Sequence, residues 1–290
     1  MSDTIKRYTK IIGQGGTGLS ERRRLPRLGK IRTGKKEKKD SGNAYPVAVD
    51  YFICDPAEGH EYLAESFFMK FGDKPKVLPI MFPLGETDKI FPQAYKKYKV
   101  SGLFCTGNGV EASRLDDKTN KWVGRECPCE FLKDGTCRSV GNLFFMLPDL
   151  PGLGVWQLDT SSVNSITNVN TVLEVLAQLA LKMGRESVAW LPLLLTISPI
   201  TVQIPGKDGK LFKKEVYILN LSIKDTLIDF MKMEASKSSS LPEIGSDMMP
   251  EPTVEEDLYP EVNLSPKHLL PDETEKDSSK VDSFVGIMRE

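Results

Sequence analysis

Four of the five cysteines lie close together in the sequence and could bind a metal ion. They form the pattern Cys105-x21-Cys127-x-Cys129-x7-Cys137. Thiolates are good ligands for zinc, and four of them make a closed tetrahedral site of the structural kind. Cys127 and Cys129 flank Pro128, so an extended backbone would present both sulfurs on one side. The glycines and turn-forming residues around them suit a chain that wraps an ion.

These residues predict zinc, with an iron–sulfur cluster, whose ligands would also be cysteines, as the alternative. The spacing is not the common Cys-x2-Cys pair, so four reduced, half-buried cysteines in a loop are a second interpretation. A disulfide framework is not expected, because the N-terminus, MSDTIKRYTK, has no apolar signal-peptide core. Cys54 lies in an apolar stretch and is interpreted as a plain core residue.

Catalytic arrangements are hard to build from a sequence with only two histidines, His60 and His268. No second histidine stands four residues after His60, so the zinc-protease motif is missing. A Ser-His-Asp triad would have to recruit one of these two histidines. Residues 13–18, GQGGTG, match G-x-G-x-x-G, but they lack the preceding strand and following helix of a dinucleotide site. We therefore expect a protein that binds, with no catalytic residues.

A basic run near the N-terminus could neutralise phosphates. Residues 21–40 carry ten Lys/Arg and three Asp/Glu. The run has no aromatic residue, so the stacking platform of single-strand binders is absent, although salt-sensitive contact with DNA would not need one. A solvated charged loop is the alternative interpretation. The candidate nucleic-acid or partner-binding residues are Arg22, Arg23, Arg24, Arg27, Lys30, Arg32, Lys35 and Lys36.

Alternating apolar residues and turn signals predict more strands than helices. We expect strands at 47–54, 77–82, 143–147, 154–158, 188–197, 201–204 and 211–219, with GKDG at 206–209 as a hairpin turn. The turn 148–152 should join two paired strands and place Trp156 inward as a core anchor. The segment 96–137 is expected to be rich in loops.

Helices are expected at 57–71, 171–183 and 223–233. The apolar positions of the first are Tyr62, Phe67, Phe68 and Phe71, and those of the second are Val172, Val175, Leu176, Leu179, Ala180 and Met183. Asn170 or Thr171 could cap the second helix. Because strands do not alternate strictly with helices, the predicted fold class is α+β. We expect a strand-rich single domain with a cysteine-rich metal-knuckle insertion and disordered termini.

Charge divides the chain into a body and two terminal segments. Residues 235–290 hold thirteen Asp/Glu and five Lys/Arg and lack apolar periodicity, which predicts an acidic disordered tail. Residues 1–24 are expected to be a flexible leader, and 25–234 the domain, with 96–140 as the knuckle. A basic body suits nucleic acid or a protein bound to it, although the tail could serve solubility alone. The longest apolar stretch, 190–197, is far shorter than the roughly 20 residues that cross a bilayer, so no membrane partner is expected.

Several motifs resemble the family of phage recombination directionality factor-like proteins. The motifs are GKIRTG at 29–34, VDYF at 49–52, VLPIMFP at 77–83, CPCEFLKDGTC at 127–137 and LFFMLPDLPGLGVWQLDT at 143–160. The similarity covers residues 25–220, and LPDLPGLGVWQL is its most specific part. The glycine-rich leader and the acidic tail fall outside it.

The resemblance implies a protein of a temperate phage or integrated element, located in the host bacterial cytoplasm. Such a protein would bind the element's large serine integrase on attachment-site DNA and favour prophage excision over integration, without having to contact DNA itself. Two alternatives stay open. A metal-dependent nuclease or hydrolase would need an open metal position with carboxylate or histidine ligands. A general zinc-containing nucleic-acid-binding accessory protein would bind in a steeply salt-dependent way.

Overall fold

Two β-sheets make up most of the structure. The computed structural model describes residues 24–38, 44–99, 102–182, 184–185, 187–205, 211–228 and 244–252. The large sheet has the order β2-β1-β9-β8-β4-β5-β6-β7, and the small sheet has the order β11-β10-β3. The strands of the large sheet are β1 (Arg27–Lys38), β2 (Ala44–Pro56), β4 (Gln93–Lys99), β5 (Gly102–Gly107), β6 (Glu111–Leu115), β7 (Trp122–Glu126), β8 (Arg138–Phe145) and β9 (Val155–Thr160).

The small sheet and the helices complete the fold. The strands of the small sheet are β3 (Val77–Ile80), β10 (Leu193–Pro205) and β11 (Leu211–Ile223). The helices are α1 (Tyr62–Phe71), α2 (Thr87–Ile90), α3 (Glu130–Lys133) and α4 (Val163–Lys182), with a 3-10 turn, η2 (Ser246–Met248). In the large sheet β1 pairs parallel with β9, whereas the other strand pairs are antiparallel. The predicted strand-rich α+β class is confirmed.

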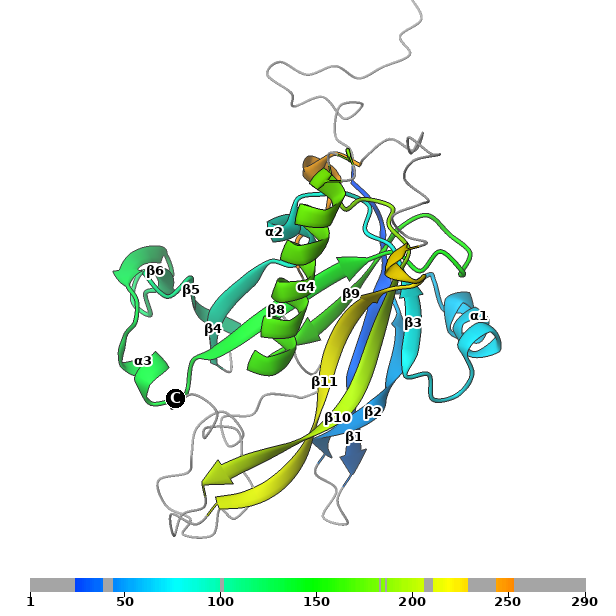
Figure 1. Ribbon diagram of the computed structural model, residues 1–290. Helices are drawn as coiled ribbons and strands as arrows, with labels where there is room; N and C mark the ends of the chain where they lie inside the picture. Colours follow the sequence, from blue (N-terminus) through cyan, green and yellow to red (C-terminus); the bar gives the residue numbers. More distant parts are fainter. Residues whose placement is uncertain are drawn as a thin grey trace, which may run out of the picture.

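The main hydrophobic core lies between the large sheet, the small sheet and α4 (Figure 1). Alternation along β9 directs Trp156 and Leu158 into this core, and both side chains are fully buried. From α4 the core receives Val169, Leu173 and Leu176, which recur at helical spacing. The inward position that the sequence predicts for Trp156 is therefore confirmed.

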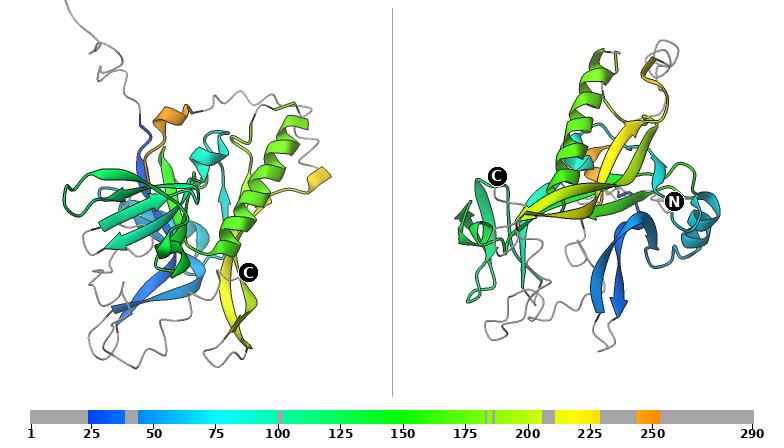
Figure 2. Two further views of the ribbon diagram at one scale, coloured as in Figure 1. Left: turned by 90° about the vertical axis from the view of Figure 1, so that its left-hand side faces the viewer. Right: turned by 60° about the horizontal axis from the view of Figure 1, so that its bottom comes forward.

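Residues 102–137, hereafter the wing, extend the large sheet beyond β4. The wing contains β5, β6, β7 and α3, and it projects away from α4 and the small sheet in both figures (Figure 1, Figure 2). The prediction that 96–137 is rich in loops is wrong, because most of this segment forms strands that pair in the large sheet. The strands were missed because they are short and polar, and all of β7 is exposed, so apolar alternation is weak.

Several element boundaries differ from the sequence prediction. The helix expected from residue 57 begins at Tyr62, because β2 continues to Pro56 and a turn follows. The helix expected from 171 begins at Val163, where Ser162 Oγ accepts a hydrogen bond from the Ser165 backbone N–H at 3.3 Å. Residues 188–197 and 201–204 were expected as two strands, but β10 is continuous through Pro199.

Other differences concern which apolar residues are buried. On α1, Phe67 is buried as expected, whereas Tyr62 and Phe68 are exposed and Leu63 is buried instead. On α4, Val175 is half exposed and Leu173 is buried. The helix expected at 223–233 does not begin at residue 223, because β11 runs to Ile223. Residues 229–233 lie outside the described ranges.

Part of the segment assigned to the acidic tail packs on the body. The Leu25 backbone N–H donates to the Met248 carbonyl at 2.8 Å, and the Ile244 N–H donates to the Pro83 carbonyl at 3.1 Å. Ile244 and Met249 pack against a second, smaller core cluster that includes Leu25. Residues 244–252 thus differ from the expected disordered tail, and residues 253–290 lie outside the described part of the chain.

Candidate functional site

One face of the β4–β5–β6 sheet places a cysteine between two cations. Cys105 on β5 is the direct cross-strand neighbour of Lys97 on β4 and of Arg114 on β6. Direct neighbours in adjacent strands point to the same side of a sheet, so these three side chains form a row. Cys105 is buried, as is Lys97.

The other three cluster cysteines reach this face through the segment 127–137. The backbone N–H of Cys127 donates to the Val110 carbonyl at 2.9 Å, which fixes the end of β7. Cys129 precedes α3, and its carbonyl accepts the Leu132 N–H at 3.1 Å. The Cys137 N–H donates to the Phe131 carbonyl at 2.8 Å and closes the segment.

All four cysteines line one cavity of about 10 Å³. This volume is close to that of a single water-sized sphere. Lys97 and Phe131 also line the cavity. The structure therefore brings the four predicted ligands around one small space.

The electrostatics of the cavity are those of crowded thiols beside cations. Burial, followed by the charges of Cys105, Cys129 and Cys127, raises the pKa of Cys137 to about 12, and Lys97 opposes this rise. Arg114 Nη2 donates to Cys129 Sγ at 3.2 Å. The surroundings of Cys137 thus favour its protonated thiol.

Phe131 lies between the two cations of the row. Lys97 Nζ is 3.4 Å from the centroid of the Phe131 ring, and the Arg114 guanidinium carbon is 4.6 Å from it. Cations over an aromatic face are attracted by its quadrupole. Phe131 also meets Phe104 edge-on, with 6.2 Å between ring centroids. These contacts give the wing a core of few residues, in which cysteines are a large part: Phe104, Cys105 and Ala112, with Leu115, Cys127 and Phe131 packed against them.

Among the described residues, no group of three or more His, Cys, Asp or Glu side chains is arranged as a formed metal site. Zinc binding therefore stays a prediction. It is motivated by the four thiols that line one cavity. Cys54 lies apart from the cluster and packs against the main core. Burial, and then the charge of Asp55, raises the pKa of Cys54 to about 12, as for an inert core thiol.

The basic run near the N-terminus forms β1, inside the large sheet between β2 and β9. The alternative of a solvated charged loop is wrong for the described residues 27–38, because they pair with β2 along most of their length and residues 27–31 also pair with β9. Arg24 is exposed just before β1, whereas Arg22 and Arg23 lie outside the described residues.

Toward the end of β1 the basic side chains lie nearer the surface. Lys35 is exposed, and its Nζ lies 3.0 Å from Glu37 Oε1. Lys36 is half-buried, and burial, followed by the nearby charge of Arg32, lowers its pKa. Arg32 itself donates to Asp55 Oδ2 on β2 at 2.7 Å.

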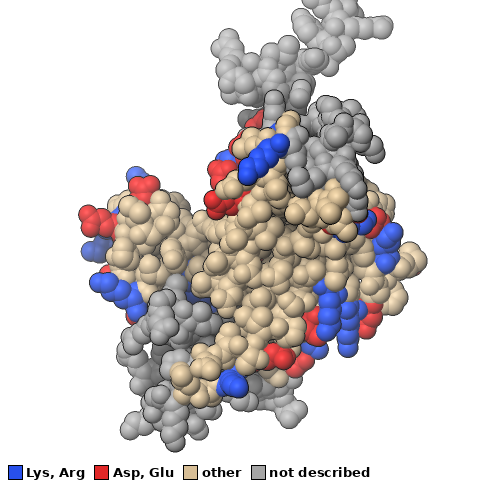
Figure 3. Space-filling model, viewed as in Figure 1, with Lys and Arg blue, Asp and Glu red and all other residues tan. Residues whose placement is uncertain are grey.

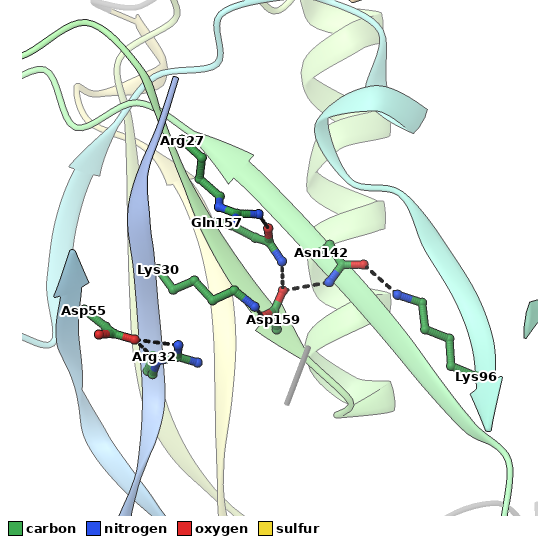
Figure 4. A network of polar contacts seen from close by, with 8 residues as sticks. All are labelled: Arg27, Lys30, Arg32, Asp55, Lys96, Asn142, Gln157 and Asp159. Carbon is green, nitrogen blue, oxygen red and sulfur yellow. Dashed lines mark hydrogen bonds and ion pairs between the residues drawn. The ribbon is translucent and has the colours of Figure 1, made fainter. Parts of the chain in front are cut away.

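Arg27 and Lys30 of β1 join a buried polar network centred on Asp159 (Figure 4). Asp159 accepts hydrogen bonds from Lys30 Nζ at 2.7 Å, Asn142 Nδ2 at 2.7 Å and Gln157 Nε2 at 2.6 Å. Gln157 Oε1 accepts from Arg27 Nη1 at 3.3 Å, and Asn142 Oδ1 accepts from Lys96 Nζ at 3.3 Å. Residues of β9 alternate between faces, so this network lies on the opposite side of the sheet from Trp156 and Leu158.

The sequence prediction did not include the polar residues around Asp159 or the cation beside the four cysteines. Gln157 and Asp159 alternate with apolar residues along β9, which is a readable signal for one polar face. Lys96 and Asn142 join them only through strand pairing, which the sequence does not announce. The same holds for Arg114, whose proximity to the cysteines depends on the β5–β6 register.

Of the other candidate residues, only His60 lies in the described part of the chain. The GQGGTG motif and His268 lie outside the described residues. His60 precedes α1 in a turn, where its ring meets that of Tyr62 at 6.3 Å between centroids. No helix in the described part of the chain has the length and apolar character needed to cross a bilayer.

Comparison with known proteins gives one match. The model of the Gp3-like family, described as recombination directionality factor-like, matches residues 28–224. No curated protein and no solved structure matches the chain. The match spans β1 through β11 and includes the wing, the Asp159 network and both sheets. The chain belongs to the recombination directionality factor-like family, and this membership supports a role in phage recombination.

Proposed function

We propose that this protein binds a phage serine integrase on its attachment-site DNA and favours prophage excision over integration. The observation that carries the proposal is the family match, which covers both sheets and the wing. The motifs in β1, β2, β3, β8 and β9 lie within the matched residues.

Such a function requires binding but no catalysis. A factor that binds one of two integrase–DNA states more tightly shifts the equilibrium towards that state. A coupling free energy of about 1–3 kcal/mol changes an affinity 5–150-fold, which suffices to reverse a preference between products. The protein therefore needs a surface that distinguishes two arrangements of its partner.

The outer face of α4 is our candidate for this surface. Its sequence contains only two charged residues, Glu174 and Lys182. Figure 3 shows few charged side chains over α4 and the adjoining β10–β11 hairpin. Val175 and Leu181 are 50% and 67% exposed there. Depletion of charge with exposed apolar side chains is typical of the centre of a protein–protein interface, which suits an integrase better than a phosphate backbone.

The two alternative functions have less support. A metal-dependent nuclease needs carboxylates or histidines around an open metal position, whereas the residues of this type that line the cavity are four cysteines. A phosphate-binding accessory protein would use basic side chains, but Lys30 and Arg32 of β1 have carboxylate partners in Asp159 and Asp55. Such pairing reduces the charge that a phosphate would meet.

The decisive experiment adds the purified protein to recombination assays with the serine integrase of the same element. We expect recombination between the hybrid attachment sites to be stimulated and integration to be inhibited. If neither reaction changes, the proposed function is wrong. Turnover of DNA or RNA that depends on added metal would instead favour the nuclease. Binding to DNA without integrase, weakening linearly with salt on a log–log plot, would favour the accessory protein.

A further inference from the structure

We propose that Cys105, Cys127, Cys129 and Cys137 bind one Zn²⁺ ion, which fastens the segment 127–137 to the β4–β5–β6 face of the wing. The four sulfurs line one cavity of about 10 Å³. The proposal is independent of the proposed function, because it concerns how the wing is held together.

The ligands come from two parts of the wing, β5 and the segment 127–137, which otherwise share only the small core around Phe104 and Phe131. Cys105 lies in the middle of β5 and is fixed by pairing on both sides. The other three lie on the segment 127–137, whose one short helix, α3, has no buried residue. An ion held by both parts would add to this small core and fasten the segment to the sheet.

The surrounding charges suit a zinc tetrathiolate, which carries a net charge of about −2. Arg114 and Lys97 flank Cys105 across the sheet. Arg114 already donates to Cys129 Sγ, and its buried Nε has no hydrogen-bond partner among the described residues. An N–H donor beside thiolates stabilises their negative charge, so both cations would orient and neutralise the ligand set.

The size of the cavity favours a single ion over an iron–sulfur cluster. Its volume is that of about one water-sized sphere, whereas a cluster contains several iron and sulfide atoms. Histidine ligands are not at hand, because His60 lies beside α1 and the other histidine, His268, is outside the described residues. Four thiolates around one ion of this kind point to zinc.

The four thiols do not form a ready metal-binding group in the described part of the chain. Binding would therefore draw the sulfurs inward and release their protons, which couples metal affinity to the order of the segment 127–137. Cys127 and Cys129 are half-buried, so their side chains have room to turn. Removing the ion should loosen the wing and leave the main core intact.

The test measures metal in the full chain, purified under reducing conditions without chelators. We expect about one zinc per chain, lost or strongly weakened when any one of the four cysteines is replaced by Ser. Cys54→Ser is the matched control and should keep its zinc. Stoichiometric zinc in two or more of the four variants would overturn the shared site, and iron in place of zinc would overturn the choice of ion.

Cobalt gives a measurement that does not depend on the variants folding. Titrating the metal-free wild-type chain with Co²⁺ should produce the visible bands of a tetrahedral site and the strong near-ultraviolet thiolate absorption of four sulfur ligands. A wild-type chain with neither zinc nor these bands would overturn the proposal. Arg114→Leu should weaken zinc binding about 10-fold, while Arg125→Leu, at an exposed position on the next strand, should not.

Discussion

Lys30 Nζ lies 2.7 Å from Asp159 Oδ2, and the two side chains are only 4% and 6% exposed. The pair joins β1 to β9, two strands that are far apart in the sequence and parallel in the sheet. Removing one member of a buried ion pair leaves the other charge without compensation. The pair therefore predicts a large and asymmetric response to mutation.

Lys30→Met should reduce the free energy of unfolding by about 3–5 kcal/mol, because Asp159 would keep a buried charge. The double variant Lys30→Met/Asp159→Asn should recover part of this loss, since no charge is then buried. Urea unfolding followed by far-UV circular dichroism measures both. Lys35→Met is the control at an exposed pair, and its stability should match that of the wild type. If Lys30→Met lost as little stability as Lys35→Met, the buried ion pair would not have the role described here.

The cost of Lys30→Met should also depend on pH. Burial raises the pKa of Asp159 above its ordinary value of 3.8, and Lys30 is the largest influence opposing this rise. Without Lys30 the pKa rises further, so the folded state binds the proton more tightly than the unfolded chain does. The destabilisation is then present above the folded-state pKa and is relieved as pH falls through it. The stability gap to wild type should narrow as the pH falls from neutral towards acid, and a gap that widens would contradict this assignment.

Trp156→Ala should destabilise the protein by about 3–5 kcal/mol, because it empties a large part of the main core. The Trp156 side chain is fully buried. Trp122→Ala is the matched control, since Trp122 is 50% exposed on β7, and its effect should stay within about 0.5 kcal/mol. Circular dichroism is the suitable probe, because both variants alter tryptophan fluorescence. Equal effects of the two substitutions would show that Trp156 is not an anchor.

Gly29→Ala should cost about 1–3 kcal/mol or more, because there is no room for a methyl group. A Cβ at Gly29 would lie 2.4 Å from the Asp55 carbonyl oxygen and 2.6 Å from Pro56 Cα, both of them backbone atoms. Its φ of +156° adds to the strain. Gly124→Ala, where no atom lies within 4 Å of the new Cβ, should leave thermal stability nearly unchanged. Comparing the melting temperatures of the two variants tests the close approach of β1 to β2.

Two charge substitutions test the α4 face. Val175→Glu and Leu181→Glu should each lower integrase affinity at least 10-fold with little change in stability, because a charge at the centre of an interface is desolvated without a partner. Phe68→Glu, 57% exposed on α1, is the control that should bind normally. Affinity for the integrase–DNA complex is the measurement. Normal binding by both α4 variants would exclude the α4 face as the integrase-binding surface. The directionality function itself would still be tested by the recombination assay.

Truncation tests where the folded body ends. A chain ending at Met233 loses Ile244, Met248 and Met249, which contact the body, so its melting temperature should fall. A chain ending at Pro252 keeps these contacts and should melt like the full protein. Equal melting temperatures in both truncations would show that 244–252 add no stability. A fall in both would show that residues beyond 252 contribute.

Local patterns in the sequence predicted what depends on local chemistry. The β10–β11 hairpin, the paired strands β8 and β9, and the buried Trp156 follow from alternation and turn residues. The clustering of the four cysteines around one cavity also followed, because Cys127, Cys129 and Cys137 are neighbours in sequence.

Features that depend on distant pairing were not predictable. The basic run is a strand because β2 pairs along most of it and β9 pairs with its first residues, which overrides its high charge. The strands of the wing have weak alternation, and their order in the sheet follows from tertiary register. Lys97 and Arg114 reach the cysteines through that register, so no spacing in the sequence reveals them.

The parallel pairing of β1 with β9 determines how early the large sheet can form during translation. Lys30 pairs with Gln157, so the second edge of β1 has no partner until β9 has left the ribosome. At about 5–20 residues per second, translation of the intervening chain takes on the order of ten seconds. During that interval the N-terminal hairpin presents an open strand edge, which invites pairing with other chains. Nascent chains that stall before Thr160 are therefore the ones that depend most on chaperones.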